Sequence, residues 1–254
     1  MRVIHFLYST KEKNGSPAFA EDDECFLGSF VMSNDEKPNL IGTIKDNLIR
    51  SKVKWAEEGR LLTGRPDAGH VNRLPPGQRL VTNWPVLDLG AQPDVKPENW
   101  RLRIGGAVDN PLVLTLEQFH ALPQEEFTSD VHCVTAWSRY DNHWRGVSAR
   151  TLLELVKPKM TANYVLFQSY DGYTTNVTLP VFSDSNVLLA HSWEGKPLPR
   201  EHGGPVRIVI PDWYFWKSPK WVTRIEFAEN DRPGFWETRG YHNEGDPWKE
   251  ERYS

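Results

Sequence analysis

The sequence predicts an α+β fold with mixed or antiparallel sheets and short helices. Predicted strands outnumber predicted helices, and the two do not alternate in the regular βαβ rhythm of a doubly wound sheet. The sequence has no P-loop and no GxGxxG run, and Gly203-Gly204-Pro205 is too short and lacks a following helix. A doubly wound nucleotide-binding fold is therefore not expected.

The chain is expected to consist of a lead-in and one domain. Residues 1–38 have a mixed composition, an acidic run at 21–24 and no sustained period, which predicts a flexible lead-in. Residues 39–254 are expected to form a single domain. From Leu40, apolar residues recur at a helical spacing that ends near Gly59, so a helix is expected there.

The elements that follow are predicted to be short. Proline and glycine dominate to about residue 97, which predicts an extended segment that wraps the surface. Trp100, Leu102 and Ile104 then alternate as in a strand. Residues 115–118 have the capping-box form that opens a helix. A second helix is expected at 149–156, and strands at 164–169, 173–179, 206–210 and 222–227.

Composition and charge narrow the class of protein. Hydrophobic residues make up 39% of the chain and charged residues 25%, as in an ordinary soluble globular protein. The formal net charge of −4 gives no reason to expect nucleic acid as a partner. Eleven tryptophans are a surplus that predicts packed loops and lined pockets as well as core. Because no run of about 18 apolar residues occurs, no membrane span is expected.

Cysteine usage and the N-terminus bear on the compartment. The sequence contains two cysteines, Cys25 and Cys133, and no cysteine framework surrounds either one. The apolar run at residues 3–8 is too short for a signal peptide, and charged residues follow at 11–13. Reduced thiols and a cytoplasmic location are therefore the expectation.

Cys133 is the first candidate for chemistry. It lies in the strand-like segment 131–134, which runs into Thr135-Ala136-Trp137-Ser138. A lone thiol in such a place is a nucleophile, a metal ligand or a packing residue. Taken by itself, packing is favoured, because free cysteine is among the most buried residue types.

A second candidate is the basic segment between residues 201 and 221. Gly203 and Gly204 let the backbone approach a ligand closely. Arg207 lies in an otherwise apolar strand, where an unpaired guanidinium is costly, so a carboxylate or phosphate partner is expected. Lys217, Ser218 and Lys220 add two cations and a hydroxyl near Pro219. Together they form an anion cradle, or else a salt-bridged strand followed by a solvated basic turn.

The order of these motifs resembles that of the sulfite oxidase-like molybdopterin oxidoreductases. The shared runs are Cys133-Val134 with Ala136-Trp137-Ser138, the 202–207 segment and Lys217-Ser218-Pro219-Lys220. The resemblance covers roughly residues 70–230 and is greatest to the catalytic subunit of bacterial protein-methionine-sulfoxide reductases and its small relatives. The closing stretch 234–253 also looks like the ending of those small relatives. The resemblance implies a sulfite oxidase-type molybdopterin-binding fold.

The resemblance also implies a cofactor and the residues that hold it. Molybdenum in this family takes two dithiolene sulfurs from molybdopterin and one protein thiolate, which Cys133 would supply. Arg207, Ser218 and Lys220 would bind the terminal phosphate of the pterin and nearby polar groups. The other residues assigned to cofactor binding by their matching position are Lys217, His202, Ser169, Asn83 and Trp84.

Residues close to Cys133 keep open assignments. His132 points away from Cys133 in a regular strand, which favours packing or a backbone hydrogen bond over metal contact. Arg139 and Arg145 are either binders of an anionic substrate or partners neutralised by Asp141. Trp137 either walls a metal pocket or packs in the core.

The sequence departs from true sulfite oxidases in two ways. Those enzymes carry a glycine-asparagine-arginine run soon after the ligand cysteine, where this chain has Thr135-Ala136-Trp137. Sulfite is therefore in doubt as the physiological substrate. The chain also has no haem-domain signature and no room for the C-terminal immunoglobulin-like dimerisation domain, so a monomer that exchanges electrons with a separate partner is expected.

The function expected from the resemblance is two-electron oxygen-atom transfer on a small sulfur oxyanion, a sulfoxide or a related oxo substrate. Two other hypotheses remain. In the first, Cys133 is the nucleophile of a hydrolase or transferase, with His143 or His191 as its base. In the second, the chain binds the cofactor without turnover.

Overall fold

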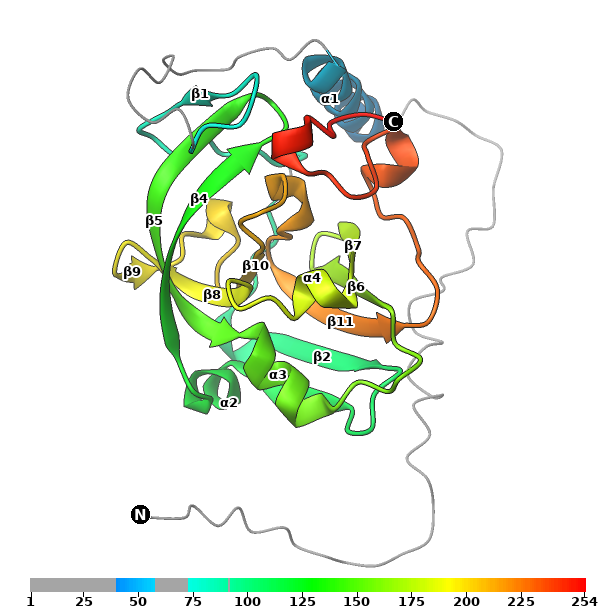
Figure 1. The fold of residues 1–254 in the computed structure, drawn as a ribbon. Coiled ribbons are helices and arrows are strands. Elements are labelled where there is room, and N and C mark those ends of the chain that lie inside the picture. Colours follow the sequence, from blue (N-terminus) through cyan, green and yellow to red (C-terminus); the bar gives the residue numbers. More distant parts are fainter. Residues whose placement is uncertain (1–39, 58–72, 91) are drawn as a thin grey trace, which may run out of the picture. The chain divides into compact units, whose positions relative to one another are not determined.

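The computed structural model describes residues 40–57, 73–90 and 92–254. The predicted lead-in at 1–38 lies outside these residues, as does the part of the proline- and glycine-rich segment at 58–72. The described residues all belong to a compact unit that begins at Leu40. They form two sheets and a few short helices, so the predicted α+β class is confirmed (Figure 1).

The first sheet contains six strands. β1, β5, β8 and β10 are neighbours in that order, while β4 pairs with β5 and β9 pairs with β8. β1 runs parallel to β5, and the other pairs are antiparallel. The bounds are β1 (Arg79–Leu80), β4 (Glu125–Cys133), β5 (Trp137–Ser148), β8 (Leu188–Trp193), β9 (Lys196–Pro197) and β10 (Arg207–Val209).

The second sheet contains five strands in the order β3-β2-β11-β6-β7. β2 and β11 are parallel although more than a hundred residues separate them, and the other pairs are antiparallel. Both sheets are therefore mixed. The bounds are β2 (Arg101–Gly106), β3 (Leu112–Thr115), β6 (Tyr164–Ser169), β7 (Thr174–Thr178) and β11 (Val222–Ala228).

The helices are short except for the first. α2 begins as predicted, because the Thr115 side chain accepts from the Gln118 amide while the Gln118 side chain accepts from the Thr115 amide. The α-helices are α1 (Leu40–Glu57), α2 (Leu116–Ala121), α3 (Ala149–Val156) and α4 (Leu179–Phe182). The 3₁₀ turns are η2 (Pro97–Asn99), η3 (Arg200–His202), η4 (Phe215–Lys217), η5 (Glu237–Arg239) and η6 (Pro247–Lys249).

Two groups of buried side chains form the core. One contains the inward residues of the second sheet together with α3, and the other lies against the first sheet and contains Cys133. β5 takes part in both because Trp144 belongs to the second group and Val147 to the first. Gly146 lets β5 lie close to β8, since a Cβ there would stand 2.0 Å from the Leu189 carbonyl oxygen. The candidate site lies beside the second of these groups, which contains Cys133 and many aromatic side chains.

Candidate active site

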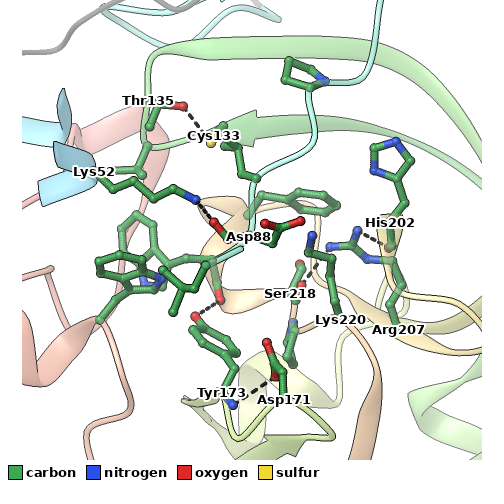
Figure 2. A pocket seen from close by; sticks show the side chains of 18 of the residues that line it. Lys52, Asp88, Cys133, Thr135, Asp171, Tyr173, His202, Arg207, Ser218 and Lys220 are labelled. Atoms are coloured by element: carbon green, nitrogen blue, oxygen red, sulfur yellow. Dashed lines mark hydrogen bonds between the residues drawn. The ribbon is translucent and has the colours of Figure 1, made fainter. Parts of the chain in front are cut away.

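A cavity of about 900 Å³, its open mouth included, lies next to the Cys133 side of the core. Its size is that of a site for a small ligand or cofactor. Distant parts of the chain line it: α1, the segment after β1, the turn after β4, the β6–β7 turn, the stretch from η3 to Trp221 and the C-terminal segment. In Figure 2, Lys52 and Cys133 approach one part of this cavity, and His202, Arg207 and Lys220 approach another.

Cys133 is placed by a tight turn between two strands. It ends β4 and pairs with Trp137 at the start of β5, while its carbonyl oxygen accepts from the Ala136 amide at 3.0 Å. Ala136 has a φ of 67°, in the left-handed region. The Gln78 amide also donates to the Cys133 carbonyl at 3.1 Å, so the backbone beneath the thiol is held from both sides.

The Cys133 thiol is buried and unpaired, and it faces the cavity. Its sulfur lies 3.2 Å from the Thr135 hydroxyl. Burial raises the pKa of this thiol, while Thr135 and the cations Lys52 and Arg252 act in the opposite direction. The protein therefore presents a protonated thiol that a bound metal would convert to a thiolate.

Two cations gather at the other part of the cavity. Arg207, at the start of β10, is 2% exposed. Its Nη1 donates to the His202 carbonyl at 2.9 Å and its Nη2 to the Ser218 carbonyl at 2.8 Å. Lys220 donates to the Glu201 carbonyl at 2.8 Å. Among the described residues, neither cation forms an ion pair with a carboxylate.

The pKa values of Arg207 and Lys220 are both lowered, as expected for cations without a carboxylate partner among the described residues. Burial and, after it, the nearby charge of Arg207 lower the pKa of Lys220 to about 7, although Asp88 and Asp171 act to raise it. Burial also lowers the pKa of Arg207. Arg207 is buried and Lys220 is half-buried, and both donate to carbonyl oxygens, so a phosphate group would restore their charge balance.

Gly203 allows these cations to come together. Its φ of +107° suits glycine, and a Cβ there would lie 2.9 Å from the Lys220 Cβ and 3.1 Å from the Arg207 Cβ. Gly203 therefore serves to bring two basic side chains side by side, whereas Gly204 lets the backbone lie close to the Leu198 carbonyl.

An aromatic stack forms another wall of the cavity. The Trp84 ring lies flat on the His202 ring, with centroids 3.7 Å apart and an interplanar angle of 7°. The Arg207 guanidinium lies 4.1 Å from the Phe215 ring centroid and 5.4 Å from that of Trp84. Burial lowers the pKa of His202 to about 3, so the imidazole is neutral at physiological pH.

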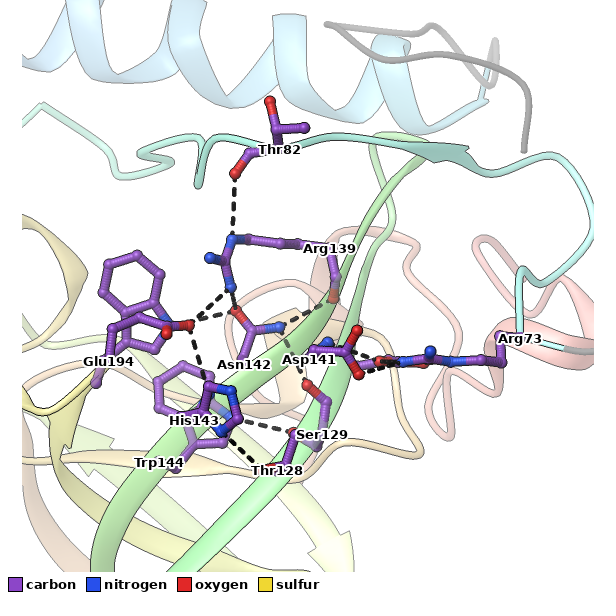
Figure 3. A network of polar contacts seen from close by, with 12 residues as sticks. Arg73, Thr82, Thr128, Ser129, Arg139, Asp141, Asn142, His143, Trp144 and Glu194 are labelled. Atoms are coloured by element: carbon purple, nitrogen blue, oxygen red, sulfur yellow. Dashed lines mark hydrogen bonds and ion pairs between the residues drawn. The ribbon is translucent and has the colours of Figure 1, made fainter. Parts of the chain in front are cut away.

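Arg139 supports this stack and does not reach the cavity. It donates to Asn142 and to the Thr82 carbonyl, and it forms an ion pair of 3.3 Å with Glu194 (Figure 3). Its guanidinium covers the Trp193 ring, and Trp193 in turn packs against Trp84. The hypothesis that Arg139 binds an anionic substrate is therefore not supported.

The other residues near Cys133 also have partners of their own. His132 shares a 2.8 Å hydrogen bond with Ser138, and it does not line the cavity. Asp141 pairs with Arg73 at 2.8 Å. His143 bonds to Thr128, and His191 bonds to Gln124 and Ser192. Neither of these last two histidines lines the cavity, so neither is placed as a base for the Cys133 thiol.

Six of the nine residues expected at the cofactor line the cavity, and three do not. Asn83 is exposed beside the lining residue Trp84. Ser169 is buried, and its hydroxyl has no hydrogen-bond partner among the described residues. The six that line the cavity are Trp84, Cys133, His202, Arg207, Ser218 and Lys220.

Lys217 is expected from the sequence to belong to the anion cradle, but it does not line the cavity. It is fully buried and forms a 2.7 Å ion pair with Glu237, and it donates to the carbonyl and side-chain oxygens of Asn176 at 3.0 Å. The 3₁₀ turn η4 directs it away from the cavity that Lys220 lines three residues later. Its charge is therefore satisfied by the protein.

Several lining residues were not singled out from the sequence. They come from α1, from the segments around β1 and β7, and from the C-terminal stretch, which no local pattern connects. Asp171-Gly172 is a dipeptide typical of a turn, but nothing in the sequence indicates that its carboxylate faces a cavity. The main members of this set are Lys52, Asp88, Asp171, Tyr173, Trp236 and Tyr241.

The lining fits a cofactor that combines an anionic group with a soft metal. Among the described residues, no cluster of three or more His, Cys, Asp or Glu side chains forms a metal site, so Cys133 is a single donor. A centre that brings its other sulfur ligands with it matches one protein thiolate. The two cations without carboxylate partners match a phosphate. The aromatic walls suit a flat ring system.

Comparisons with known proteins agree with this chemistry. The family described as oxidoreductase molybdopterin binding domain matches residues 89–236. The chain is 44% identical over 183 residues to the uncharacterized oxidoreductase YuiH of Bacillus subtilis, covering 72% of this chain and 92% of that one. It is 30% identical over 158 residues to the protein-methionine-sulfoxide reductase catalytic subunit MsrP of Campylobacter jejuni, covering 56% of this chain and 53% of the relative, about half of its length.

A solved structure shares the fold. The sulfane dehydrogenase SoxCD of Paracoccus pantotrophus superposes with a TM-score of 0.51 and 23% identity, over 55% of this chain and 40% of that chain. No helix among the described residues has the length and hydropathy needed to cross a bilayer. The chain belongs to the oxidoreductase molybdopterin binding domain family and is an oxidoreductase with a molybdopterin and molybdenum cofactor.

Proposed function

We propose that this oxidoreductase catalyses two-electron oxygen-atom transfer, with Cys133 as the protein thiolate of the molybdenum centre. The observation that carries the proposal is that an unpaired thiol and two cations without carboxylate partners line the same cavity. When bound, the cofactor supplies the redox chemistry of the metal and its oxo groups.

The residues of the chain have separate tasks in this proposal. Cys133 would hold the metal as a thiolate, and the Thr135 hydroxyl 3.2 Å away would donate to its sulfur. Arg207 and Lys220 hold the phosphate of the pterin by charge. The Ser218 hydroxyl accepts from the Ile210 amide at 2.9 Å, which leaves its own proton to donate toward the phosphate.

The substrate is proposed to be a small sulfoxide or sulfur oxyanion. Support comes from relatives whose names refer to protein-methionine sulfoxide and to sulfane. The cavity next to Cys133 also combines apolar walls with a few polar groups, as a small organic oxo compound requires. We further propose a single domain, a monomer in the cytoplasm and a separate electron partner.

The test is the metal and pterin content of protein purified from a host that makes the cofactor. We expect about one molybdenum and one pterin per chain in the wild type. Cys133→Ser should abolish oxygen-atom transfer while part of the pterin stays bound through Arg207 and Lys220. Cys25→Ser is the matched control and should keep both content and activity. Full activity in Cys133→Ser would refute the ligand assignment.

A further inference from the structure

Lys52 is a cation in the cavity that neither the family match nor the sequence motifs assign. It lies on α1, outside residues 89–236. Its side chain lines the cavity together with Cys133, and its ammonium donates to the backbone carbonyl of Asp88 (Figure 2). An ammonium has three donors, and only this one bond to a described residue uses them. No other described residue accepts from this ammonium, so within the described cavity it can donate to a ligand.

Lys52 and Cys133 line the same cavity, and each acts on the protonation of the other. Burial lowers the pKa of Lys52, while the Asp88 carboxylate and the thiolate form of Cys133 act to raise it. In turn, Lys52 is the leading cation that favours the Cys133 thiolate, followed by Arg252. Lys52 also lowers the pKa of Lys220, so the metal-ligand part and the phosphate-binding part belong to one continuous cavity.

The position of α1 is fixed by contacts on both sides of Lys52. The Tyr241 hydroxyl, which also lines the cavity, donates to the Lys52 carbonyl at 3.4 Å. Ile49 and Val53 pack against the same buried group that contains Cys133. The ammonium therefore projects from an anchored backbone, as a ligand-binding side chain requires.

We propose that Lys52 binds the oxygen of the oxo substrate beside Cys133. An oxygen bonded to sulfur carries negative charge in a sulfoxide and in a sulfur oxyanion, and a buried ammonium donates strongly to either one. The organic part of a sulfoxide would lie on apolar side chains that line the same cavity, namely Leu87, Leu89, Val134 and Trp236. This inference rests on the proposed function and extends it to the residue that recognises the substrate.

The competing explanation is structural. Lys52 would then only tie α1 to the segment around Asp88, through the bond to its carbonyl. A latch of that kind would stabilise the protein and leave substrate affinity unchanged once the cavity is assembled. The two roles are separable because stability, cofactor content and affinity are measured independently.

The experiment uses the holoenzyme and three variants: Lys52→Met, Lys52→Arg and the control Arg50→Met. Arg50 is an exposed cation on the same helix that does not line the cavity. Molybdenum, pterin and thermal midpoint are measured for each protein. Calorimetric titration with sulfate, an oxyanion that does not react, gives an affinity independent of turnover, since the cofactor phosphate already occupies Arg207 and Lys220.

Two test substrates distinguish a sulfoxide, which gives up its oxygen, from a sulfur oxyanion, which accepts one. Dimethyl sulfoxide is reduced to dimethyl sulfide and water with two electrons from an added dye and two protons. Sulfite takes an oxygen from water and delivers two electrons to an oxidised dye, with release of two protons. We expect Lys52→Met to weaken sulfate binding and to raise the KM of the true substrate about tenfold, as loss of a charged hydrogen bond predicts. Lys52→Arg should restore most of both, and Arg50→Met should match the wild type.

Each other outcome has a definite meaning. Unchanged sulfate affinity and KM in a fully loaded Lys52→Met protein would overturn the inference and leave the proposed function intact. A large fall in thermal midpoint and cofactor content, with normal affinity in the loaded fraction, would identify a structural latch and also overturn it. Absence of molybdenum and pterin from the wild type would overturn the proposed function and the inference together.

Discussion

Lys217 and Lys220 show how much depends on the direction of a single side chain. Both are basic, both lie in the segment that the sequence marked as an anion cradle, and they are three residues apart. η4 ends at Lys217 with its ammonium turned to Glu237, whereas Lys220 lines the cavity. The residue types predict an anion cradle in this segment, which stays a prediction. They did not predict that one cation would be used inside the protein, because Glu237 is distant in sequence.

Replacing Lys217 should destabilise the protein strongly. Lys217→Met leaves the Glu237 carboxylate buried without its cation, and breaking a buried pair in this way costs about 3–5 kcal/mol. The free energy of unfolding from a denaturant titration measures the effect. The control is Lys249→Met, because Lys249 pairs with Asp246 at an exposed site, where solvent screens the pair, and this change should alter stability far less than Lys217→Met. Equal effects of the two variants would contradict the expected role of burial.

The pKa of Lys220 predicts a pH dependence of anion binding. In cofactor-free protein this pKa is about 7, so the ammonium is charged below pH 7 and neutral above it. An anion binds the charged form, so sulfate affinity should be highest below pH 7 and should fall as pH rises above it. The other charged groups that act on Lys220 are Arg207, Asp88, Lys52 and Asp171.

Calorimetric titration with sulfate at several pH values checks this dependence. Sulfate itself does not titrate in this range, so the protein alone sets the trend. Lys220→Met should bind sulfate more weakly and lose the fall above pH 7. A fall of the same size in Lys220→Met would assign the titration to another group.

At the scale of elements, local patterns predicted those parts that local chemistry controls. α3 occupies residues 149–156 as expected, and β6 occupies 164–169. The long strand β5 was missed, although it joins the two core groups. Two of its buried positions are Asn142 and Gly146, neither of which carries a hydrophobic side chain. The alternation of apolar and polar residues that marks a strand is therefore interrupted at these positions. A strand held by side-chain hydrogen bonds and a close contact to β8 leaves only a weak signal in the sequence.

The capping box of α2 allows a prediction at this scale. Thr115→Ala removes the side chain that accepts from the Gln118 amide at 3.2 Å. We expect a loss of about 1 kcal/mol in the free energy of unfolding, the usual cost of removing such a cap. Thr115→Ser keeps the hydroxyl and should retain most of the stability. Denaturant titration of both variants distinguishes loss of the cap from a general effect of substitution.

At the scale of the whole molecule, the cavity was the least predictable feature. The sequence located the thiol and the main basic segment, because each is a compact motif in one place. The complete lining comes from segments that begin at α1 and end near the C-terminus, so it exists only after both sheets have formed. Lys52, Asp88 and Tyr241 therefore had no recognisable signal before folding brought them together.

Cofactor binding should raise the stability of the whole molecule. The cavity is assembled only in the folded state, so a ligand that binds there stabilises that state by about 2.7 kcal/mol when present at 100 times its Kd. Protein from a host that cannot make molybdopterin should therefore melt at a lower temperature than loaded protein. Scanning calorimetry measures the difference. Lys220→Met should reduce it, and equal melting of loaded and cofactor-free wild type would contradict it.

Trp84, which stacks on His202, is one of several tryptophans at the cavity, so the intrinsic fluorescence of the protein should respond to a bound cofactor. Five of the eleven tryptophans line the cavity, at positions 84, 137, 216, 221 and 236. Indole emission overlaps the near-ultraviolet absorption of a pterin. A pterin bound among these rings would therefore quench their fluorescence by resonance energy transfer. The brightness of the protein's own fluorescence would then report the fraction of molecules that carry cofactor, continuously and without adding a dye.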